Sequence, residues 1–226
     1  MSAPPLPPLS LLESRILGVL VEKERTVPDS YPLTLNALAT GCNQKTSRNP
    51  VITASEAELQ AALDTLRRLA LVIESSGGRV MRYEQNVKRV LDVPALAVPL
   101  LAMLALRGAQ TSAELRANCA RIENYADASS VEGFLHELAE RPQGALVMLL
   151  PRQPGEREAR WVHLLGGPVV PEPTVFAPAH RGGEDDASSS PALAVETLAA
   201  RLARLEEVVE QLQASIAALT AARDES

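Results

Sequence analysis

One order of elements occurs twice along this chain of 226 residues, and it constrains the fold more than any other feature. Capping boxes, Ser10 with Glu13 and Ser55 with Glu58, open two amphipathic helices, and a Gly-Gly turn separates two short apolar runs. The elements expected from these signals are helices over 10–24, 34–42 and 55–69, and a β-hairpin with strands 71–75 and 79–83. Three helices followed by a two-stranded ribbon is the order of a winged helix-turn-helix domain.

The second occurrence follows directly. A helix over 94–107 precedes a short helix that the capping box of Thr111 and Glu114 opens. Ser129 and Glu132 are expected to cap a third helix, and a second hairpin has strands 145–150 and 159–165. A repeated order of this kind indicates a duplicated unit. The predicted fold class is mainly α with small β-hairpins (α+β), as tandem winged helix-turn-helix domains over 10–93 and 94–167. Residues 1–9, rich in proline, are expected to be disordered.

The C-terminal region has a different composition. Residues 168–192 are rich in Pro, Gly, Ser and acidic residues, which predicts a disordered linker. Residues 193–223 then carry a heptad repeat, which predicts a coiled-coil helix with β-branched residues at a and leucine at d, a pattern that favours a parallel homodimer. The alternative is a single amphipathic helix that folds back on its own domain. The a and d positions are Val195, Leu198, Leu202, Leu205, Val209, Leu212, Ile216 and Leu219.

Charge and composition exclude several classes of protein. The net charge of −6 comes from residues 171–226, whereas 43–89 is locally basic. With 3% aromatic residues, a stacking platform for single strands is not expected. Two isolated cysteines argue against disulfides or a zinc module and favour the cytoplasm. Since no 18-residue apolar run occurs, no membrane contact is expected.

Long stretches of the chain between residues 9 and 166 resemble the YceH-like family of bacterial proteins. The resemblance implies a tandem winged-helix fold, commonly with a short C-terminal coiled coil, and it implies no established activity. The stretches that carry it are Glu22-Lys-Glu, Pro28-Asp-Ser-Tyr-Pro-Leu-Thr-Leu-Asn-Ala-Leu38, Cys42-Asn-Gln-Lys45, Arg48-Asn-Pro-Val51, Arg107-Gly-Ala-Gln-Thr111, Glu114-Leu-Arg116 and Leu150-Pro-Arg-Gln-Pro-Gly155.

The loop before the third helix and the first hairpin hold the candidate contacts with a nucleic acid or a partner. Cations there would neutralise phosphates, and amides would read base edges. The alternative is that Asn43, Asn49 and Pro50 only shape a turn, while the cations pair with Glu56 or Glu84. The candidates are Asn43, Gln44, Lys45, Arg48, Arg79 and Arg82.

Both third helices weaken the nucleic-acid interpretation, because their exposed faces carry carboxylates that repel phosphate. These are Glu56 and Asp64 in the first unit, and Glu132, Glu137 and Glu140 in the second. Tyr31, between two prolines, is a candidate partner contact or a lid over the first core, and the residues leave both open.

Catalytic and metal-binding patterns are not found in the sequence. Cys42 and Cys119 end the second helix of each unit and are expected to be buried packing groups. The histidines, His136, His163 and His180, lie on separate elements with no ligand spacing. We therefore expect no catalytic site, cofactor or metal.

Two classes of function remain. The favoured one is a non-catalytic regulatory or scaffolding protein that uses tandem winged helices to bind an unidentified protein and is dimerised by its coiled coil. The alternative is a DNA-binding transcriptional regulator that uses the loop and wing of the first unit.

Overall fold

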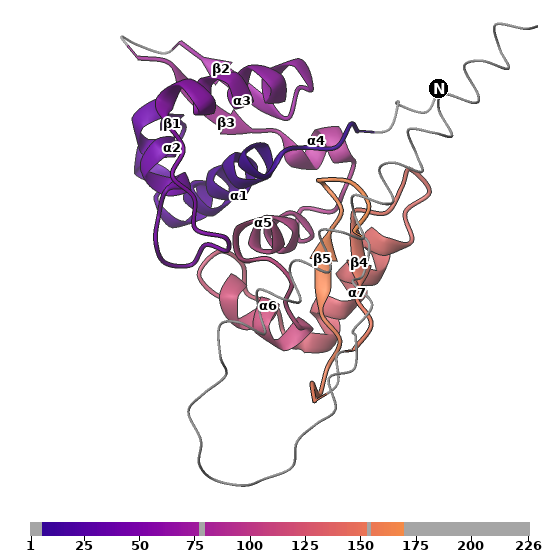
Figure 1. The fold of residues 1–226 in the computed structure, drawn as a ribbon. Helices are drawn as coiled ribbons and strands as arrows, with labels where there is room; N and C mark the ends of the chain where they lie inside the picture. Colours follow the sequence, from indigo (N-terminus) through magenta and orange to yellow (C-terminus); the bar gives the residue numbers. More distant parts are fainter. Residues whose placement is uncertain (1–5, 77–79, 153–154, 170–226) are drawn as a thin grey trace, which may run out of the picture. The chain divides into compact units, whose positions relative to one another are not determined.

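The computed structural model describes residues 6–76, 80–152 and 155–169, all of which belong to one compact unit (Figure 1). The predicted linker over 168–192 lies almost entirely outside these residues. The predicted coiled coil over 193–223 and the tip of the first hairpin, including Arg79, lie outside them as well. The described part is mainly helical with small antiparallel sheets, which confirms the α+β class.

The first half contains the elements that the sequence predicts and three more, η1, β1 and α4. The capping boxes of Ser10 with Glu13 and Ser55 with Glu58 are both formed, because each serine accepts from the backbone three residues on and each glutamate reaches back. The helices are α1 (Leu11–Thr26), η1 (Pro28–Ser30), α2 (Leu35–Cys42), α3 (Glu56–Arg68) and α4 (Val87–Leu91), and the strands are β1 (Leu33–Thr34), β2 (Val72–Ser75) and β3 (Arg82–Gln85).

The second half repeats this order of helices and strands. The prediction for its third helix needs one correction. The elements are α5 (Val98–Arg107), α6 (Ser112–Cys119), α7 (Ala128–Ala139), β4 (Val147–Leu149) and β5 (Trp161–His163). The predicted cap of Ser129 with Glu132 is wrong, since the N-cap of α7 is Asp127. Its Oδ1 accepts from both the backbone N and the Oγ of Ser130, at 2.7 Å each. A carboxylate is a strong acceptor at the positive end of a helix, which explains why the helix begins earlier.

In each half, a third short segment pairs with one strand of the hairpin. β1 pairs with β3, so the first sheet has the order β1-β3-β2. In the second half Gln110 forms an isolated antiparallel bridge with Trp161 beside the β4–β5 pair. Both added segments lie just before the second helix of their half. The two halves therefore share this detail as well as their order of helices.

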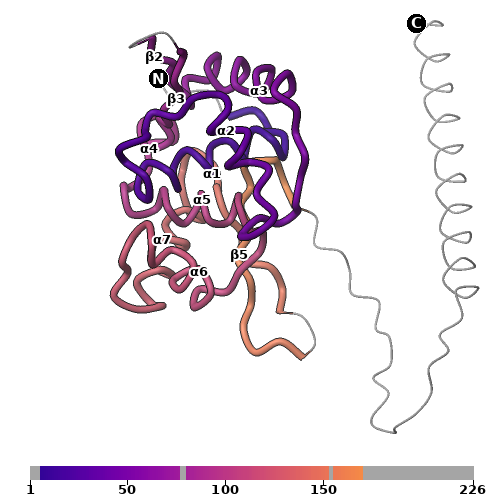
Figure 2. Tube along the Cα trace, turned by 90° about the vertical axis from the view of Figure 1, so that its left-hand side faces the viewer, coloured from indigo at the N-terminus to yellow at the C-terminus, as the bar shows by residue number. Residues whose placement is uncertain are grey.

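Helices α1 and α5 lie against each other and join the two halves (Figures 1 and 2). Every residue from Ser14 to Val21 and from Val98 to Leu106 is buried. Gly18 allows the close contact, since a Cβ there would lie 2.8 Å from Leu106 Cγ. The halves consequently share one hydrophobic core. Although α5 is strongly apolar, no helix among the described residues is long and apolar enough to cross a membrane.

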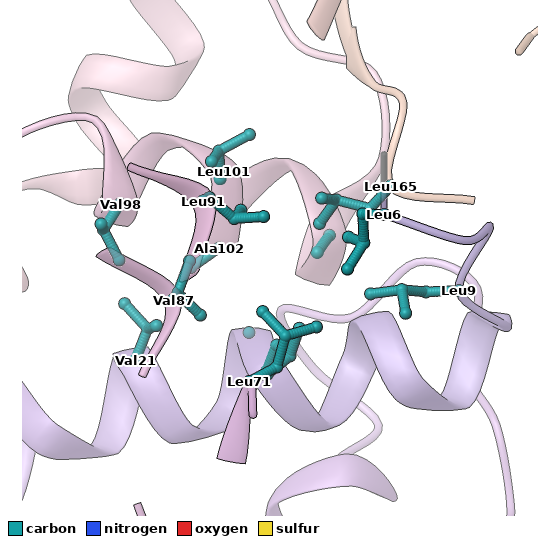
Figure 3. A pocket seen from close by; sticks show the side chains of 13 residues that line it. Leu6, Leu9, Val21, Leu71, Val87, Leu91, Val98, Leu101, Ala102 and Leu165 are labelled. Carbon is teal, nitrogen blue, oxygen red and sulfur yellow. The ribbon is translucent and has the colours of Figure 1, made fainter. Parts of the chain in front are cut away.

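The N-terminal segment is ordered close to its first helix. Leu9 is 4% exposed, and its backbone N donates to Leu165 O over 2.8 Å. The expected disorder over 1–9 is therefore wrong for Leu9, because its side chain joins the core and its backbone is bonded to the end of the second half. The chain thus enters the first half and leaves the second half beside the same core (Figure 3).

Candidate functional site

Arg48, a candidate surface contact, lies inside the molecule in the loop between α2 and α3. Its side chain is 0% exposed, and its Nη2 lies 2.7 Å from Glu22 Oε2. Its Nη1 donates to Glu22 Oε1 at 3.3 Å, and its Nε donates to Gly41 O at 3.1 Å. The expectation that Arg48 contacts DNA or a partner at the surface is therefore wrong, since α1 and α2 enclose its guanidinium and take up its charge. The partner in this ion pair is Glu22, and neither Glu56 nor Glu84.

A second arginine, Arg15 of α1, is buried beside Arg48. Its Nη2 donates to Pro50 O at 2.7 Å and its Nη1 to Cys42 O at 3.4 Å. Cys42 O, like the Gly41 O that binds Arg48, belongs to the last turn of α2, where carbonyls lack helical partners and carry partial negative charge. The two cations are thus stabilised by one helix terminus. Burial, and then the nearby charge of Arg48, lowers the pKa of Arg15.

Glu22 is the one carboxylate in direct contact with this pair of arginines among the described residues. Burial alone would raise its pKa, but the hydrogen bonds and charge of Arg48, together with Lys23, hold the pKa below its usual range. Glu22 is therefore ionised at neutral pH and compensates the buried guanidinium of Arg48.

The two candidate amides shape the same loop. Asn43 Nδ2 donates to Ala54 O at 2.9 Å, and Asn43 Oδ1 accepts from Ala54 N at 2.8 Å. Gln44 Oε1 accepts from Arg48 Nη2 at 2.6 Å. Both polar groups of Asn43 are consequently paired inside the chain, where they fix the path of the loop from α2 to α3.

The far side of the loop bonds to the second half. Asn49 N donates to Leu106 O at 2.8 Å, and Arg107 Nη2 donates to Ser47 Oγ at 2.8 Å. We call residues 43–50 the clasp loop, because they connect α1 and α2 to the C-terminal end of α5. Four of the stretches that resemble the YceH-like family contribute a residue to these contacts: those with Glu22, Cys42 to Lys45, Arg48 and Arg107.

The remaining candidate cations differ in their surroundings. Lys45 is exposed on the clasp loop. Arg82 of β3 is also exposed, but its Nη1 donates to Pro32 O at 2.6 Å and holds the segment after η1 against the sheet. Arg79 lies outside the described residues, as do the predicted dimerisation residues between 195 and 219. Of the six candidate contacts, the structure therefore leaves Lys45 as the cation in contact with solvent and without a hydrogen bond in the described chain.

Tyr31 packs against the core of the first half. Its ring is half-buried, and its hydroxyl accepts from the backbone N of Gln85 at 2.7 Å. Burial raises the pKa of the phenol. The position of the ring is that of a lid on the core, one of the two alternatives that the sequence left open.

The second half has an ion pair that the sequence did not reveal. Arg160 Nη1 lies 2.6 Å from Glu114 Oε2, and its Nε lies 3.0 Å from Glu156 Oε1. Glu114 also completes the capping box of α6, and the side-chain hydrogen bonds from Arg160 lower its pKa. This contact fastens the second hairpin to α6. The separation of 46 residues explains why a local pattern could not predict it.

The groups with possible reactivity are packed in the core or apart from one another. Both cysteines are buried, and burial raises the pKa of Cys42 and of Cys119 to about 12, so the thiols stay protonated. Burial lowers the pKa of His163. Among residues 6–76, 80–152 and 155–169, no group of three His, Cys, Asp or Glu side chains is arranged to hold a metal ion.

An apolar pocket lies where the two halves meet (Figure 3). Side chains from α1, α4 and α5 line it, and Leu6, Leu9 and Leu165 lie together at one end. The free space inside is about 10 Å³, which admits one water molecule at most. The lining is entirely apolar, so the pocket is a small packing defect of the shared core. Its volume is too small for an organic ligand.

A family described as "Protein of unknown function, DUF480" matches residues 9–156. A UPF0502 protein of Dechloromonas aromatica is similar over 208 residues at 55% identity, which covers 92% of this chain and 94% of the relative. One from Methylibium petroleiphilum is 62% identical over 177 residues, covering 78% and 75%. One from Burkholderia pseudomallei is 53% identical over 213 residues, covering 92% and 89%.

Proposed function

The chain belongs to the DUF480 (UPF0502, YceH-like) family, and we propose that it is a non-catalytic regulatory or scaffolding protein that binds other proteins through two winged-helix halves. The order of elements supports the winged-helix interpretation. In each half three helices precede an antiparallel hairpin, and a short segment before the second helix pairs with the hairpin. Both third helices, α3 and α7, keep one face exposed.

The observation that carries this proposal is the internal use of the clasp loop. A winged helix that reads DNA needs free cations and amides close to its third helix. Here Arg48 pairs with Glu22, Asn43 pairs with Ala54, and Asn49 N bonds to the second half. Moving these groups onto a phosphate would break the contacts that hold α2 and α5 together. The loop therefore favours a structural role over DNA contact.

The third helices support the same interpretation. Glu56 and Asp64 are exposed on α3, and Glu132 and Glu137 are exposed on α7. Carboxylates near the phosphates of a duplex oppose binding, whereas they are ordinary groups at the rim of a protein interface. Faces of this kind suit recognition of a protein.

Affinity capture with the full chain, with and without nuclease, tests the proposal. We expect the same protein partner to be recovered in both samples, because no nucleic acid bridges the two proteins. Anisotropy titrations with duplex DNA at low salt are expected to show negligible binding. Salt-dependent binding with a log-log slope of about −0.9 per phosphate, made shallower by Lys45→Ala, would overturn the proposal in favour of a DNA-binding regulator.

We also propose that the heptads over 193–223 make the protein a homodimer. The support is the sequence pattern alone, with β-branched residues at a and leucine at d. Light scattering is expected to give a dimer for the full chain and a monomer for a chain that ends at Pro191. A dimer that persists without the heptads would contradict the proposal and assign the interface to residues before 191.

A further inference from the structure

Three glycines lie inside helices of the described chain, and one of them has no neighbour that requires it. A Cβ at Gly18 would lie 2.8 Å from Leu106 Cγ, and a Cβ at Gly41 would lie 2.6 Å from Val19 Cγ1. A Cβ at Gly133, in the middle of α7, would meet nothing within 4 Å. Glycine weakens a helix relative to alanine. Its presence at the other two positions is explained by a closely packed neighbour, and at Gly133 the described chain supplies none.

Gly133 lies at the centre of an exposed helix face. The exposed positions of α7 and its C-cap follow one another at helical spacing, while Val131, Leu135 and Leu138 face the core. Ser129 precedes Gly133 by one turn, so two small residues leave room for the backbone of another helix to approach. About one turn later, the ring of His136 packs edge-on against the ring of Trp161, with 5.1 Å between the ring centroids. This contact holds the His136 ring beside Gly133. The exposed positions are Ser129, Glu132, Gly133, His136, Glu137 and Glu140.

A groove of about 410 Å³ continues this face at the C-terminal end of α7. Asp92, Glu137 and Glu140 line it together with Arg141, Pro142 and neighbouring residues. Within the described chain none of the three carboxylates forms an ion pair, while Arg141 donates its hydrogen bonds to Leu91 O and Gly144 O. Arg141 partly offsets the charge of Asp92, and Glu137 and Glu140 leave the groove with an excess of negative charge and enough volume for long side chains, which suits Lys or Arg.

The corresponding face of α3 is different, because three of its charged side chains, Glu58, Asp64 and Arg67, are engaged within the first half. Asp64 pairs with Arg67, which also pairs with Glu74 at 2.7 Å. Glu58 is engaged in the capping box with Ser55. Within the part of the chain that the structure describes, the exposed carboxylates of α7 form no ion pair, whereas Asp64 of α3 does, so α7 has the more open face.

We propose that the exposed face of α7 and the adjoining groove dock a helix of a partner protein that carries lysine or arginine. The partner helix packs over Ser129 and Gly133, and its cations reach Glu137, Glu140 and Asp92. This inference rests on the proposed protein-binding function and specifies the surface and the chemistry of the partner. Phosphate-bearing ligands are excluded from this face by the same carboxylates.

The test uses the full chain and a dye-labelled, alanine-rich helical peptide of 16 residues with lysines spaced four apart. The matched peptide has glutamine in place of each lysine. We expect the lysine peptide to bind, more tightly at low salt, and the glutamine peptide not to bind. The double variant Glu137→Lys/Glu140→Lys is expected to weaken binding about tenfold or more, because attraction becomes repulsion. The double variant Asp29→Lys/Glu84→Lys, in the first half and outside both third helices, changes the net charge equally and is expected to retain the affinity.

Gly133→Leu tests the close approach separately from the charge. We expect it to abolish peptide binding while circular dichroism shows a folded protein, because its side chain extends into open space. Amide shifts on the isotope-labelled full chain are expected to change along 129–143. Equal binding by the α7 variants, or shifts confined to α3 or to the acidic residues after 171, would overturn the proposal. Such a result would leave the protein-binding function standing, since salt-dependent binding of duplex DNA is the result that overturns that function.

Discussion

At the scale of single residues, two adjacent guanidiniums are buried with one carboxylate between α1 and the clasp loop. Arg48 is compensated by Glu22, and Arg15 is compensated by carbonyl dipoles at the end of α2. Burying a charge is unfavourable unless hydrogen bonds and an opposite charge replace its hydration. The arrangement meets this condition for Arg48 by using groups from three separate segments of the chain.

Glu22→Gln is expected to destabilise the protein by about 3 kcal/mol at pH 7, because Arg48 would remain buried without a counter-charge. Since the pKa of Glu22 is lowered in the folded state, its contribution is present above the unfolded-state value of 4.5 and is lost as the pH falls through the lower folded-state pKa. Urea titrations from pH 7 to pH 3 measure the difference. The difference in unfolding free energy between wild type and Glu22→Gln should become smaller below pH 4.5.

A double variant is the control for this prediction. Replacing the pair by apolar residues of similar volume, Arg48→Met with Glu22→Leu, removes the buried charge together with its partner and should cost less than Glu22→Gln. A difference between wild type and Glu22→Gln that stays constant from pH 7 to pH 3 would show that the carboxylate charge is not the source of the stability.

The sequence placed Arg48 at the surface because its local context is a polar loop with a turn. Nothing within a few residues of Arg48 shows that Glu22, 26 positions earlier, lies beside it. The resemblance to the YceH-like family singles out both stretches, but it does not say that they touch. Contacts between distant segments are fixed by the packing of α1 on α2, which no local pattern contains.

At the scale of elements, the local signals were reliable where side chain and backbone interact within one turn. The capping boxes at Ser10, Ser55 and Thr111 form as predicted. At the start of α7 both Asp127 and Ser129 are residue types that can cap a helix, and Asp127 is the N-cap in the structure. β1, with two residues, is too short for a period-two pattern to reveal, and it exists because β3 offers an edge.

The contact between α1 and α5 is closest to the backbone of α1 at Gly18, where a side chain has no room. Gly18→Ala is expected to destabilise the protein by about 1–3 kcal/mol, because its Cβ would lie 2.8 Å from Leu106 Cγ and 3.1 Å from Ala102 O. The carbonyl belongs to the backbone of α5 and yields only if the helices separate. Gly133→Ala is the matched control and should stabilise by about 0.5–1 kcal/mol. Thermal unfolding of both variants compares the two, and equal effects would contradict the assigned packing.

At the scale of the whole described molecule, duplication did not produce two independent domains. The sequence predicted units over 10–93 and 94–167 and left open whether they pack rigidly. The structure shows α1 and α5 buried against each other, the clasp loop bonded to Leu106, and Leu9 bonded to Leu165. The buried residues of α5 also belong to the single hydrophobic core that both halves share. Neither half therefore keeps a complete core when the other is removed.

We accordingly expect residues 6–169 to unfold in one cooperative transition, because the loss of either half would expose the apolar surfaces of α1 and α5. Trp161, the single tryptophan of the chain, reports on the second half, and amide exchange of α3 reports on the first. Urea curves from tryptophan fluorescence and far-ultraviolet circular dichroism should coincide in midpoint and slope, and α3 amides should exchange with the same free energy of opening as those of α5. Two separated transitions, with α3 opening while Trp161 stays native, would show that the halves are independent. That result would also remove the structural role of the clasp loop, since its bonds to α5 would then contribute nothing to the stability of the first half.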